Sequence, residues 1–519
     1  MKKKVLMKRK ECRDCLFDEM VFKMEPSSNV INKKLNSKEL LISFSLFLIF
    51  VFGILILTGT INSGIHLIDD HEFYTIGNIL QEHGFRNGLI QSMRNDYAIR
   101  FRPFYSFTRT IGVYLFATNT VLWSICKGIE ISISMFFFYV FARLMNTNQF
   151  FSALFSLLIL LGEQSAIWWR LGPQESLGIM LFSAAMLSTY YLSKKRNALS
   201  VFIFILILAI LSLQKETFCI SMPGFFILLL ALECFWSSKK ESWKTILWEF
   251  CKKHSIEIIL LAVIFFTEIY IIVFDTGLDT LGHAGFHSDM TIVNYIMGIY
   301  ASYTYGCLPY APLIVIAAAL LVKSTMKRGV FSKGEICEML FVIFLFAPQQ
   351  ISYAKTTMHE RYLIPWVVSV FYLIIIIGCR MIGSNKRLKI SMGCILFLFT
   401  GFFFSRAVIS ANDFAQKGRD LQQCIEYVVD HTEEDDSMIA ISGGEPDVAF
   451  NIIFKYEYSY QDCGILADYE DNLVEVGTAD ILIGETGQLY SILDEAKLSL
   501  DDYTVFQTAN YEVGIKGRR

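Results

Sequence analysis

The sequence predicts an α-helical protein that crosses the membrane many times and carries a small α/β domain at its C-terminus. Of 519 residues, 54% are hydrophobic and only 18% are charged, a composition too apolar for a soluble protein of this length. Residues 412–519 hold 23 acidic and 7 basic residues, a net charge of −16, whereas the preceding residues have a net charge of +13. A basic membrane part therefore precedes an acidic soluble domain.

Long apolar runs predict about eleven transmembrane helices. Each run is close to the length needed to cross about 30 Å of hydrocarbon at about 1.5 Å per residue. The runs cover residues 40–60, 121–142, 149–166, 175–193, 198–214, 218–236, 256–274, 303–322, 336–353, 362–382 and 389–409.

The distribution of Lys and Arg predicts the orientation. Basic residues concentrate in every second break between the runs, beginning with 11 Lys and Arg in residues 1–38. Because positive loops stay in the cytoplasm, we expect a multi-pass protein of the cell membrane with a cytoplasmic N-terminus and an extracytoplasmic C-terminal domain. The predicted parts are a basic leader (1–38), a transmembrane domain (39–410) with its first outside loop at 61–120, and an acidic α/β domain (411–519).

The acidic domain shows both helical and strand patterns. Apolar spacing predicts a helix over residues 413–430, and short apolar runs predict buried strands at 437–443 and 479–484. The last segment, 505–516, alternates polar and apolar residues around Asn510. No catalytic signature occurs here.

The first outside loop opens with an acidic cluster. The segment GIHLIDDHEFY places Asp69, Asp70, His71 and Glu72 close to the end of the first run. Repulsion and partial desolvation favour raised carboxyl pKa values or a bound divalent cation, either of which suits a general base or a metal-assisted transfer. The alternative is a hydrated loop beside the membrane.

The same loop carries an unusual number of cations. The segment NDYAIRFRPFYSFTR contains Asp96, Arg100, Arg102 and Arg109 among aromatic residues. Arginine binds phosphate in a fixed planar geometry, so we expect phosphate binding here. Anchoring to lipid headgroups is the alternative.

Further charged groups lie in other breaks predicted on the same face. Each break places a cation beside a carboxylate, and ionisable groups at the membrane edge are costly and often functional. Any one pair could be purely structural, but their common face predicts a shared cavity. The pairs are Arg170 with Glu175, Lys215 with Glu216, and Arg361 with Glu360, which His359 precedes. By contrast, Lys127 and Glu130 inside a run are expected to neutralise one another.

This layout resembles the glycosyltransferase-C superfamily of integral membrane enzymes, which use sugars linked to lipid phosphates. The acidic motif IDDHEFY matches the family's motif after the first span, with Asp70 four residues before Tyr74 as in members that read D-E-x-x-Y. The segments RFRPF, RLGPQE, QKE and HERYLIP resemble the short polar motifs of bacterial members. Where many members have Glu after the aspartate, this chain has His71.

The resemblance implies transfer of a hexose or pentose from a polyprenyl-phosphate donor to a hydroxyl of a glycan, lipid or protein, with inversion at the anomeric carbon. It makes Asp70 the general base or a metal ligand, with Asp69 as the alternative and Glu72 as a third catalytic candidate. Asp69 and Asp70 could hold a divalent cation, Mg²⁺ or Mn²⁺. The cations expected to bind the donor phosphate are Arg100, Arg102, Lys215 and Arg361. The other residues expected around the cavity are His71, Asp96, Arg170, Glu175, Glu216, His359 and Glu360. No nucleic-acid partner is expected.

Three other functions compete with this interpretation. A transporter or flippase for lipid-linked sugars predicts charges near the middle of the spans and two similar halves, neither of which the sequence shows. A polymerase or ligase of lipid-linked glycans usually has its large outside loop late in the chain, whereas here the large loop comes first. A structural or sensory protein would leave the cluster at Asp69–Glu72 without a purpose.

Overall fold

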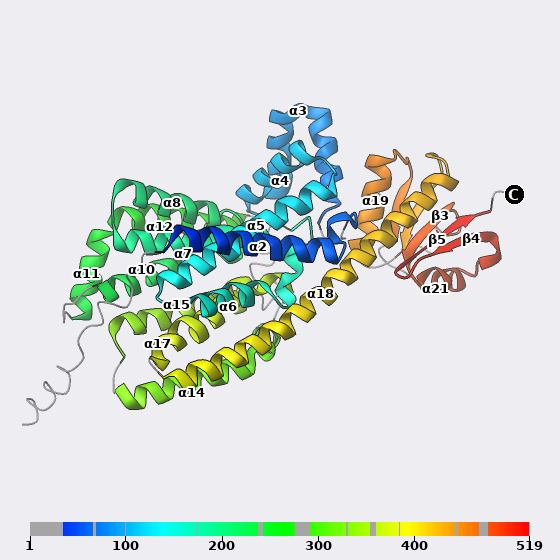
Figure 1. Ribbon diagram of the computed structural model, residues 1–519. Coiled ribbons are helices and arrows are strands. Elements are labelled where there is room, and N and C mark those ends of the chain that lie inside the picture. Colours follow the sequence, from blue (N-terminus) through cyan, green and yellow to red (C-terminus); the bar gives the residue numbers. More distant parts are fainter. Residues whose placement is uncertain are drawn as a thin grey trace, which may run out of the picture.

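The computed structural model describes residues 35–65, 69–98, 100–173, 175–236, 242–275, 291–328, 331–352, 360–383, 385–441, 445–466 and 476–517. It confirms the predicted fold class, because long apolar helices form most of the protein and a small sheet lies at the C-terminal end. In Figure 1 the helices form an elongated bundle, with α3 and α4 projecting from one side and the sheet lying at one end.

Seven helical segments among the described residues are long and apolar enough to cross a membrane. They are Ser37–Leu57 (α2), Thr120–Leu144 (α5), Glu175–Lys194 (α7), Glu216–Trp236 (α9 and α10), Ile292–Leu320 (α13 and part of α14), Ile364–Ile382 (α16 to α17) and Lys386–His431 (α18). The remaining helices of this part are α6 (Gln149–Leu160), α8 (Ala198–Ser212), α11 (Trp243–Lys253), α12 (Ser255–Tyr270) with a π-helical turn (Ile271–Asp275), and α15 (Lys333–Ser352).

Each of the eleven predicted apolar runs overlaps a helix, but the count of about eleven spans is not confirmed. Two of the runs form shorter apolar helices, α6 and α8. The predicted run 303–322 divides between α13 (Ile292–Cys307) and α14 (Ala311–Arg328), with Pro309 in the turn between them. Proline lacks the amide proton that a continuous α-helix needs, so the segment passes through the short 3₁₀ turn Leu308–Tyr310 there.

Asparagine side chains begin many of these helices. Asn119, Asn148, Asn197 and Asn385 each accept a hydrogen bond from a backbone amide in the first turn of α5, α6, α8 and α18, respectively. These bonds satisfy amides that have no partner within the helix, so the short polar breaks of the sequence set where the helices start.

The bundle has a packed interior and an apolar exterior. Its core includes the buried indoles of Trp168, Trp169 and Trp366. On the outside, large side chains such as Leu57 on α2 (88% exposed) and Phe274 (70% exposed) are left uncovered by the described residues. Such a surface is costly in water and suited to lipid, which agrees with a multi-pass membrane protein.

The predicted first outside loop is largely helical. It contains α3 (Glu72–Tyr97) and α4 (Pro103–Phe116), which pack against each other and project from the bundle (Figure 1). The ring of Trp123 on α5 stacks on Phe73 at 4.2 Å between centroids. A Cβ atom at Gly112 of α4 would lie 2.2 Å from the Trp123 ring, so glycine allows α4 to approach α5 closely.

A single helix joins the two parts of the protein. The last apolar run and the predicted helix 413–430 form one continuous helix, α18 (Lys386–His431), which extends from the bundle to the sheet (Figure 1). No proline interrupts this stretch, so nothing ends the helix at the membrane surface.

The C-terminal domain is a five-stranded mixed sheet between helices. The strand order is β2-β1-β3-β5-β4, with parallel pairing of β1 to β2 and β3 and antiparallel pairing of β5 to β3 and β4. The elements are β1 (Met438–Ile441), α19 (Glu445–Glu457), β2 (Cys463–Leu466), β3 (Ile481–Glu485), α21 (Gln488–Glu495), β4 (Tyr503–Gln507) and β5 (Tyr511–Lys516). One apolar core joins the sheet to α18 and α19, and a second joins it to α21.

Candidate active site at the first loop

A cavity of about 190 Å³ lies where the first loop meets the ends of the membrane helices. It brings together five segments that are distant in the sequence. They are the start of α3, the linker to α4 with its first turn, the loop before α7, the break before α9, and the 3₁₀ turn Glu360–Leu363. The lining residues are Asp69, Glu72, Arg100, Arg102, Tyr105, Pro173, Glu175, Lys215 and Tyr362.

Asp69 reaches the cavity through an unusual backbone conformation. Its φ of 58° lies in the left-handed region, which costs a residue with a Cβ roughly 1–2 kcal/mol. The next residue, Asp70, is fully buried and does not line the cavity. Of the two predicted candidates for the base, Asp69 is therefore the one that faces the cavity.

His71 is buried behind the cavity, at the start of α3. Burial lowers the pKa of its imidazole, although the nearby Glu72 and Asp69 carboxylates act in the opposite direction. The ring is 8% exposed and does not line the cavity. Near neutral pH His71 is thus a neutral side chain that packs beneath the acidic segment.

Arg102 precedes α4 and is fixed on two sides. Its guanidinium donates to Asp96, with Nε at 2.9 Å and Nη2 at 2.8 Å from Oδ1, and lies 3.9 Å from the centre of the Tyr105 ring. Burial raises the pKa of the Asp96 carboxyl, and Arg102 counters only part of that rise. Burial also raises the pKa of Tyr105, whose hydroxyl stays protonated.

Lys215 pairs with a carboxylate from another loop. Its Nζ lies 2.5 Å from Glu175 Oε1 and 4.1 Å from the centre of the Tyr362 ring. The sequence grouped Arg170 with Glu175 and Lys215 with Glu216, and the structure adds an ion pair between the two groups, from Lys215 to Glu175. The loops bring Lys215 and Glu175, which are 40 residues apart in the sequence, into contact. Each charge is thereby neutralised, and an isolated charge at the membrane edge would be costly.

The remaining predicted residues lie elsewhere. Arg170 stacks on Phe414 of α18, 4.3 Å from the ring centre, and Glu216 begins α9 without lining the cavity. His359 lies outside the described residues, as do the side chains of Glu360 and Arg361. Their parts in the site stay predictions.

Buried polar groups support the loop before α7. Lys127 and Glu130, which were expected to neutralise one another, interact electrostatically, and each of them also holds this loop. The Lys127 ammonium donates to the carbonyl of Pro173, and Glu130 accepts from the hydroxyl of Ser176. These contacts hold the chain on both sides of Glu175, at Pro173 and at Ser176.

The cavity also contains residues that the sequence analysis did not select. Tyr105 and Tyr362 both line it, although their segments RFRPFY and HERYLIP drew attention through their charges. Tyr105 follows Arg102 by three residues, a spacing that brings side chains together once a helix starts at Pro103. The sequence analysis did not predict helix α4, so this spacing could not be recognised.

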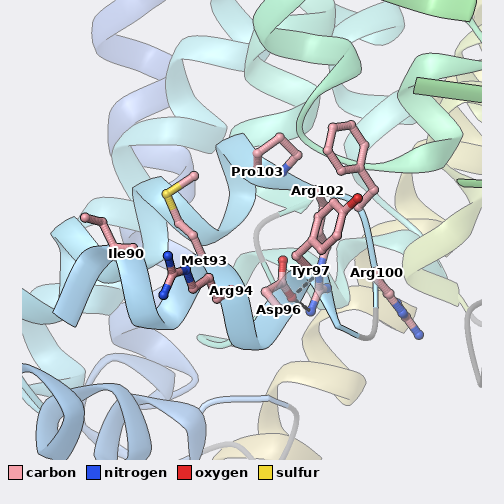
Figure 2. A pocket seen from close by; sticks show the side chains of 9 residues that line it. Ile90, Met93, Arg94, Asp96, Tyr97, Arg100, Arg102 and Pro103 are labelled. Carbon is pink, nitrogen blue, oxygen red and sulfur yellow. Dashed lines mark hydrogen bonds and ion pairs between the residues drawn. The ribbon is translucent and has the colours of Figure 1, made fainter. Parts of the chain in front are cut away.

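A second, more open cavity of about 470 Å³ adjoins the first one. Figure 2 shows its lining by the apolar side chains of Ile90, Met93 and Pro103, and by Tyr97, beside charged groups. Arg100 and Arg102 line both cavities. In Figure 2 the Arg100 side chain extends away from the Asp96–Arg102 pair.

Arg100 differs from the other two lining cations. Arg102 is paired with Asp96 and Lys215 with Glu175, whereas the guanidinium of Arg100 makes no ion pair with any described residue. An unneutralised cation between a polar and an apolar cavity is suited to an anion attached to an apolar chain.

The donor set does not fit the predicted divalent cation. Asp69 faces the cavity but Asp70 does not, and the two other lining carboxylates, Glu72 and Glu175, already pair with Arg109 and Lys215. Within the part of the chain that the structure describes, no group of three or more His, Cys, Asp or Glu side chains could hold a metal ion.

The fold and the cavity define a multi-pass helical membrane protein with a charged site at one end of its helices. Among solved structures, it is similar to ArnT from Cupriavidus metallidurans in the apo state, with a TM-score of 0.48 and 11% identity over 91% of this chain and 98% of that one. It is also similar to the oligosaccharyltransferase of Archaeoglobus fulgidus in complex with zinc and sulfate, with a TM-score of 0.40 and 11% identity over 81% of this chain and 66% of that one. No protein-family model matches the sequence, and no curated protein matches it significantly.

Proposed function

We propose that the protein is a membrane glycosyltransferase of the glycosyltransferase-C type, which moves a sugar from a polyprenyl-phosphate donor to an acceptor hydroxyl. The observation that carries the proposal is the position of Arg100, which lines both the polar cavity with Asp69 and the apolar cavity beside it. A lipid-phosphate sugar has the matching order of parts: a sugar, an anionic phosphate and an apolar chain.

In this proposal three of the lining residues act in a single displacement. The acceptor oxygen attacks the anomeric carbon, and the bond from that carbon to the phosphate oxygen breaks with its electron pair on the phosphate. The carboxylate of Asp69 takes the hydroxyl proton, while Arg100 and Arg102 stabilise the charge that develops on the phosphate. Lys215 also lines the cavity. A single displacement inverts the anomeric centre.

Asp69 is the preferred base over Asp70 because a base must come within about 3 Å of the proton that it takes. Asp70 is fully buried outside the cavity lining, so its expected role is to support the segment. A divalent cation has no part in this mechanism, and chelation with EDTA should leave transfer unchanged.

The test is release of free polyprenyl phosphate, measured by mass spectrometry, when the purified protein meets a panel of polyprenyl-phosphate sugars and a cell-envelope extract. Wild type should release it with one donor class, and Asp69→Asn should lower the rate by at least about 100-fold. Asp70→Asn should retain more activity per folded molecule. Full activity in Asp69→Asn would move the base to Asp70. Absence of release with every donor, from folded protein, would contradict the function itself.

A further inference from the structure

Arg109 of α4 lies behind the cavity and touches its wall at three points. Its guanidinium forms an ion pair with Glu72, with 2.5 Å between Nη1 and Oε2. It also donates to the hydroxyl of Tyr105 and to the backbone carbonyl of Asp69. All three partners line the cavity, whereas Arg109 does not.

The side chain of Arg109 cannot reach a substrate. It is 1% exposed and lies between the rings of Phe73 and Tyr105, whose centres are 5.6 Å and 5.2 Å from the guanidinium carbon. The sequence placed Arg109 in a cluster suited to phosphate, but its burial leaves no surface for an anion from outside. Any effect on a reaction must therefore pass through its partners.

The hydrogen bond from Arg109 is accepted by the carbonyl of Asp69, a residue whose backbone has an unfavourable positive φ. Five described residues other than glycine have a positive φ, and Asp69 is the one among them that lines the cavity. Such a conformation persists only when its surroundings hold it. A charged donor on the Asp69 carbonyl supplies one of these restraints, and the ion pair to Glu72 fixes the first turn of α3 that follows.

We propose that Arg109 is a positioning residue that holds Asp69 and Glu72 in the geometry needed for transfer. This inference rests on the proposed function, in which Asp69 is the base. Arginine suits this role because its guanidinium carries five N–H donors in a rigid planar fork, whereas the three N–H donors of a lysine ammonium all leave a single atom.

Burial alone would lower the pKa of Arg109, but the nearby Glu72 and Tyr105 raise it above its ordinary value, so the side chain stays charged. The contact with Asp69 therefore persists throughout the range of pH in which an enzyme of this kind works. No titration of Arg109 accompanies the reaction.

The decisive variant is Arg109→Lys, which keeps the charge and removes the fork. Its matched control is Arg86→Lys, at an exposed arginine of the same loop on α3. We expect Arg109→Lys to lower kcat about 10-fold to 100-fold and to change the donor KM by less than about 3-fold. The control should match wild type in both constants.

Hydrogen exchange gives a readout that does not depend on turnover. Backbone amides within Asp69–Tyr74 should exchange faster in Arg109→Lys than in wild type, and not in Arg86→Lys. If Arg109→Lys does not fold, Tyr105→Phe removes one partner of the guanidinium and should speed exchange in the same segment to a smaller extent.

Three results would overturn the inference: an unchanged kcat, a raised KM with kcat unchanged, or unchanged exchange at Asp69–Tyr74. If wild type itself releases no polyprenyl phosphate, the proposed function fails. The exchange experiment still decides whether Arg109 holds the segment.

Discussion

At the scale of single residues, the cations that line the cavity differ in whether a carboxylate of the protein neutralises them. Arg102 and Lys215 are held by Asp96 and Glu175, so each has a fixed position before any ligand arrives. Arg100 has no such pair among the described residues. A donor phosphate that reaches Arg100 gains a new charge-assisted hydrogen bond without breaking an old one.

Replacing Arg100 with glutamine should therefore weaken donor binding more than it slows the chemical step. We expect the donor KM to rise about 10-fold, because a hydrogen bond to a charged group contributes about 1.5–3 kcal/mol. The matched control is Arg86→Gln, which should leave KM unchanged. The measurement is steady-state kinetics in nanodiscs. Unchanged values of both KM and kcat in Arg100→Gln would remove Arg100 from the donor site.

His71 predicts how stability responds to acid. Burial lowers its pKa in the folded protein below that of an exposed histidine, so the unfolded chain binds the proton more tightly. The contribution of the neutral ring is fully present above the unfolded pKa of about 6.5 and is lost as the pH falls below it.

The melting temperature should accordingly fall as the pH is lowered from about 7.5 to about 5. His71→Gln has no such titration, so its melting temperature should fall less over the same range. Equal slopes for the two proteins would show that His71 is not buried in neutral form.

The sequence identified most residues of the cavity but not how they pair. All six of its charged lining residues lie in motifs with clustered charge, and the cations of the first loop stood out because cations are rare on that face. Asp69 and Asp70 have the same side chain, and the backbone conformation decides which of the two faces the cavity. The composition of the segment does not reveal that conformation. The partner of Lys215 is fixed by loops that meet in space.

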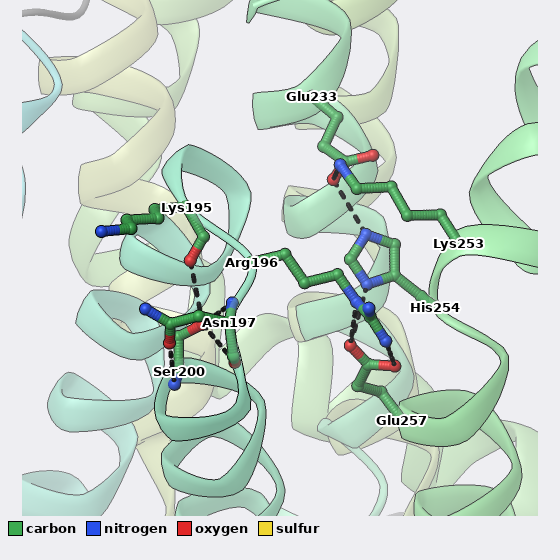
Figure 3. A network of polar contacts seen from close by, with 8 residues as sticks. All are labelled: Lys195, Arg196, Asn197, Ser200, Glu233, Lys253, His254 and Glu257. Carbon is green, nitrogen blue, oxygen red and sulfur yellow. Dashed lines mark hydrogen bonds and ion pairs between the residues drawn. The ribbon is translucent and has the colours of Figure 1, made fainter.

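At the scale of elements, a second polar network lies at the other end of the membrane helices. His254, between α11 and α12, bridges two carboxylates, with Nε2 at 2.8 Å from Glu233 and Nδ1 at 3.2 Å from Glu257. Arg196 and Lys253 complete the network in Figure 3. It ties α10, α12 and the loop before α8 together, and α7, of 20 residues or about 30 Å, separates it from Glu175.

His254→Ala should lower the thermal stability of the protein and leave donor binding at the candidate active site unchanged. The ring is fully buried, and its loss removes contacts to the buried Glu257 and the partly buried Glu233, at a cost of about 1–3 kcal/mol. The melting temperature should fall, while the donor KM per folded molecule should match wild type. Lys195→Ala, at an exposed side chain nearby, is the control. A changed KM in His254→Ala would mean that the two ends are coupled.

The elements differ in how far the sequence could predict them. Apolar runs predicted the membrane helices because lipid requires the same pattern along the whole segment. The helices α3 and α4 were not predicted, because their composition is mixed and their position is set by contacts such as Phe73 with Trp123. Tertiary packing, rather than local sequence, makes this loop helical.

At the scale of the whole molecule, the C-terminal domain and the first loop share one apolar core. Ile65 is buried among residues of α18, α19 and the sheet, and Tyr74 packs against the same core. Asp69 lies between these two anchors in the chain. The C-terminal domain therefore braces the segment from one side, while Arg109 holds it from the other.

This arrangement predicts that the effect of a core mutation on catalysis depends on which segment of the chain carries the mutated residue. Ile65→Ala and Ile425→Ala remove the same atoms from the same core, at a similar cost of about 2–5 kcal/mol in stability. Only Ile65 belongs to the segment that carries Asp69, so Ile65→Ala should lower kcat further than Ile425→Ala when both are compared per folded molecule. Kinetics below the melting temperature of both variants would measure this difference. Equal values of kcat would mean that the domain stabilises the protein without positioning the base, and a larger loss in Ile425→Ala would place the coupling in α18 instead.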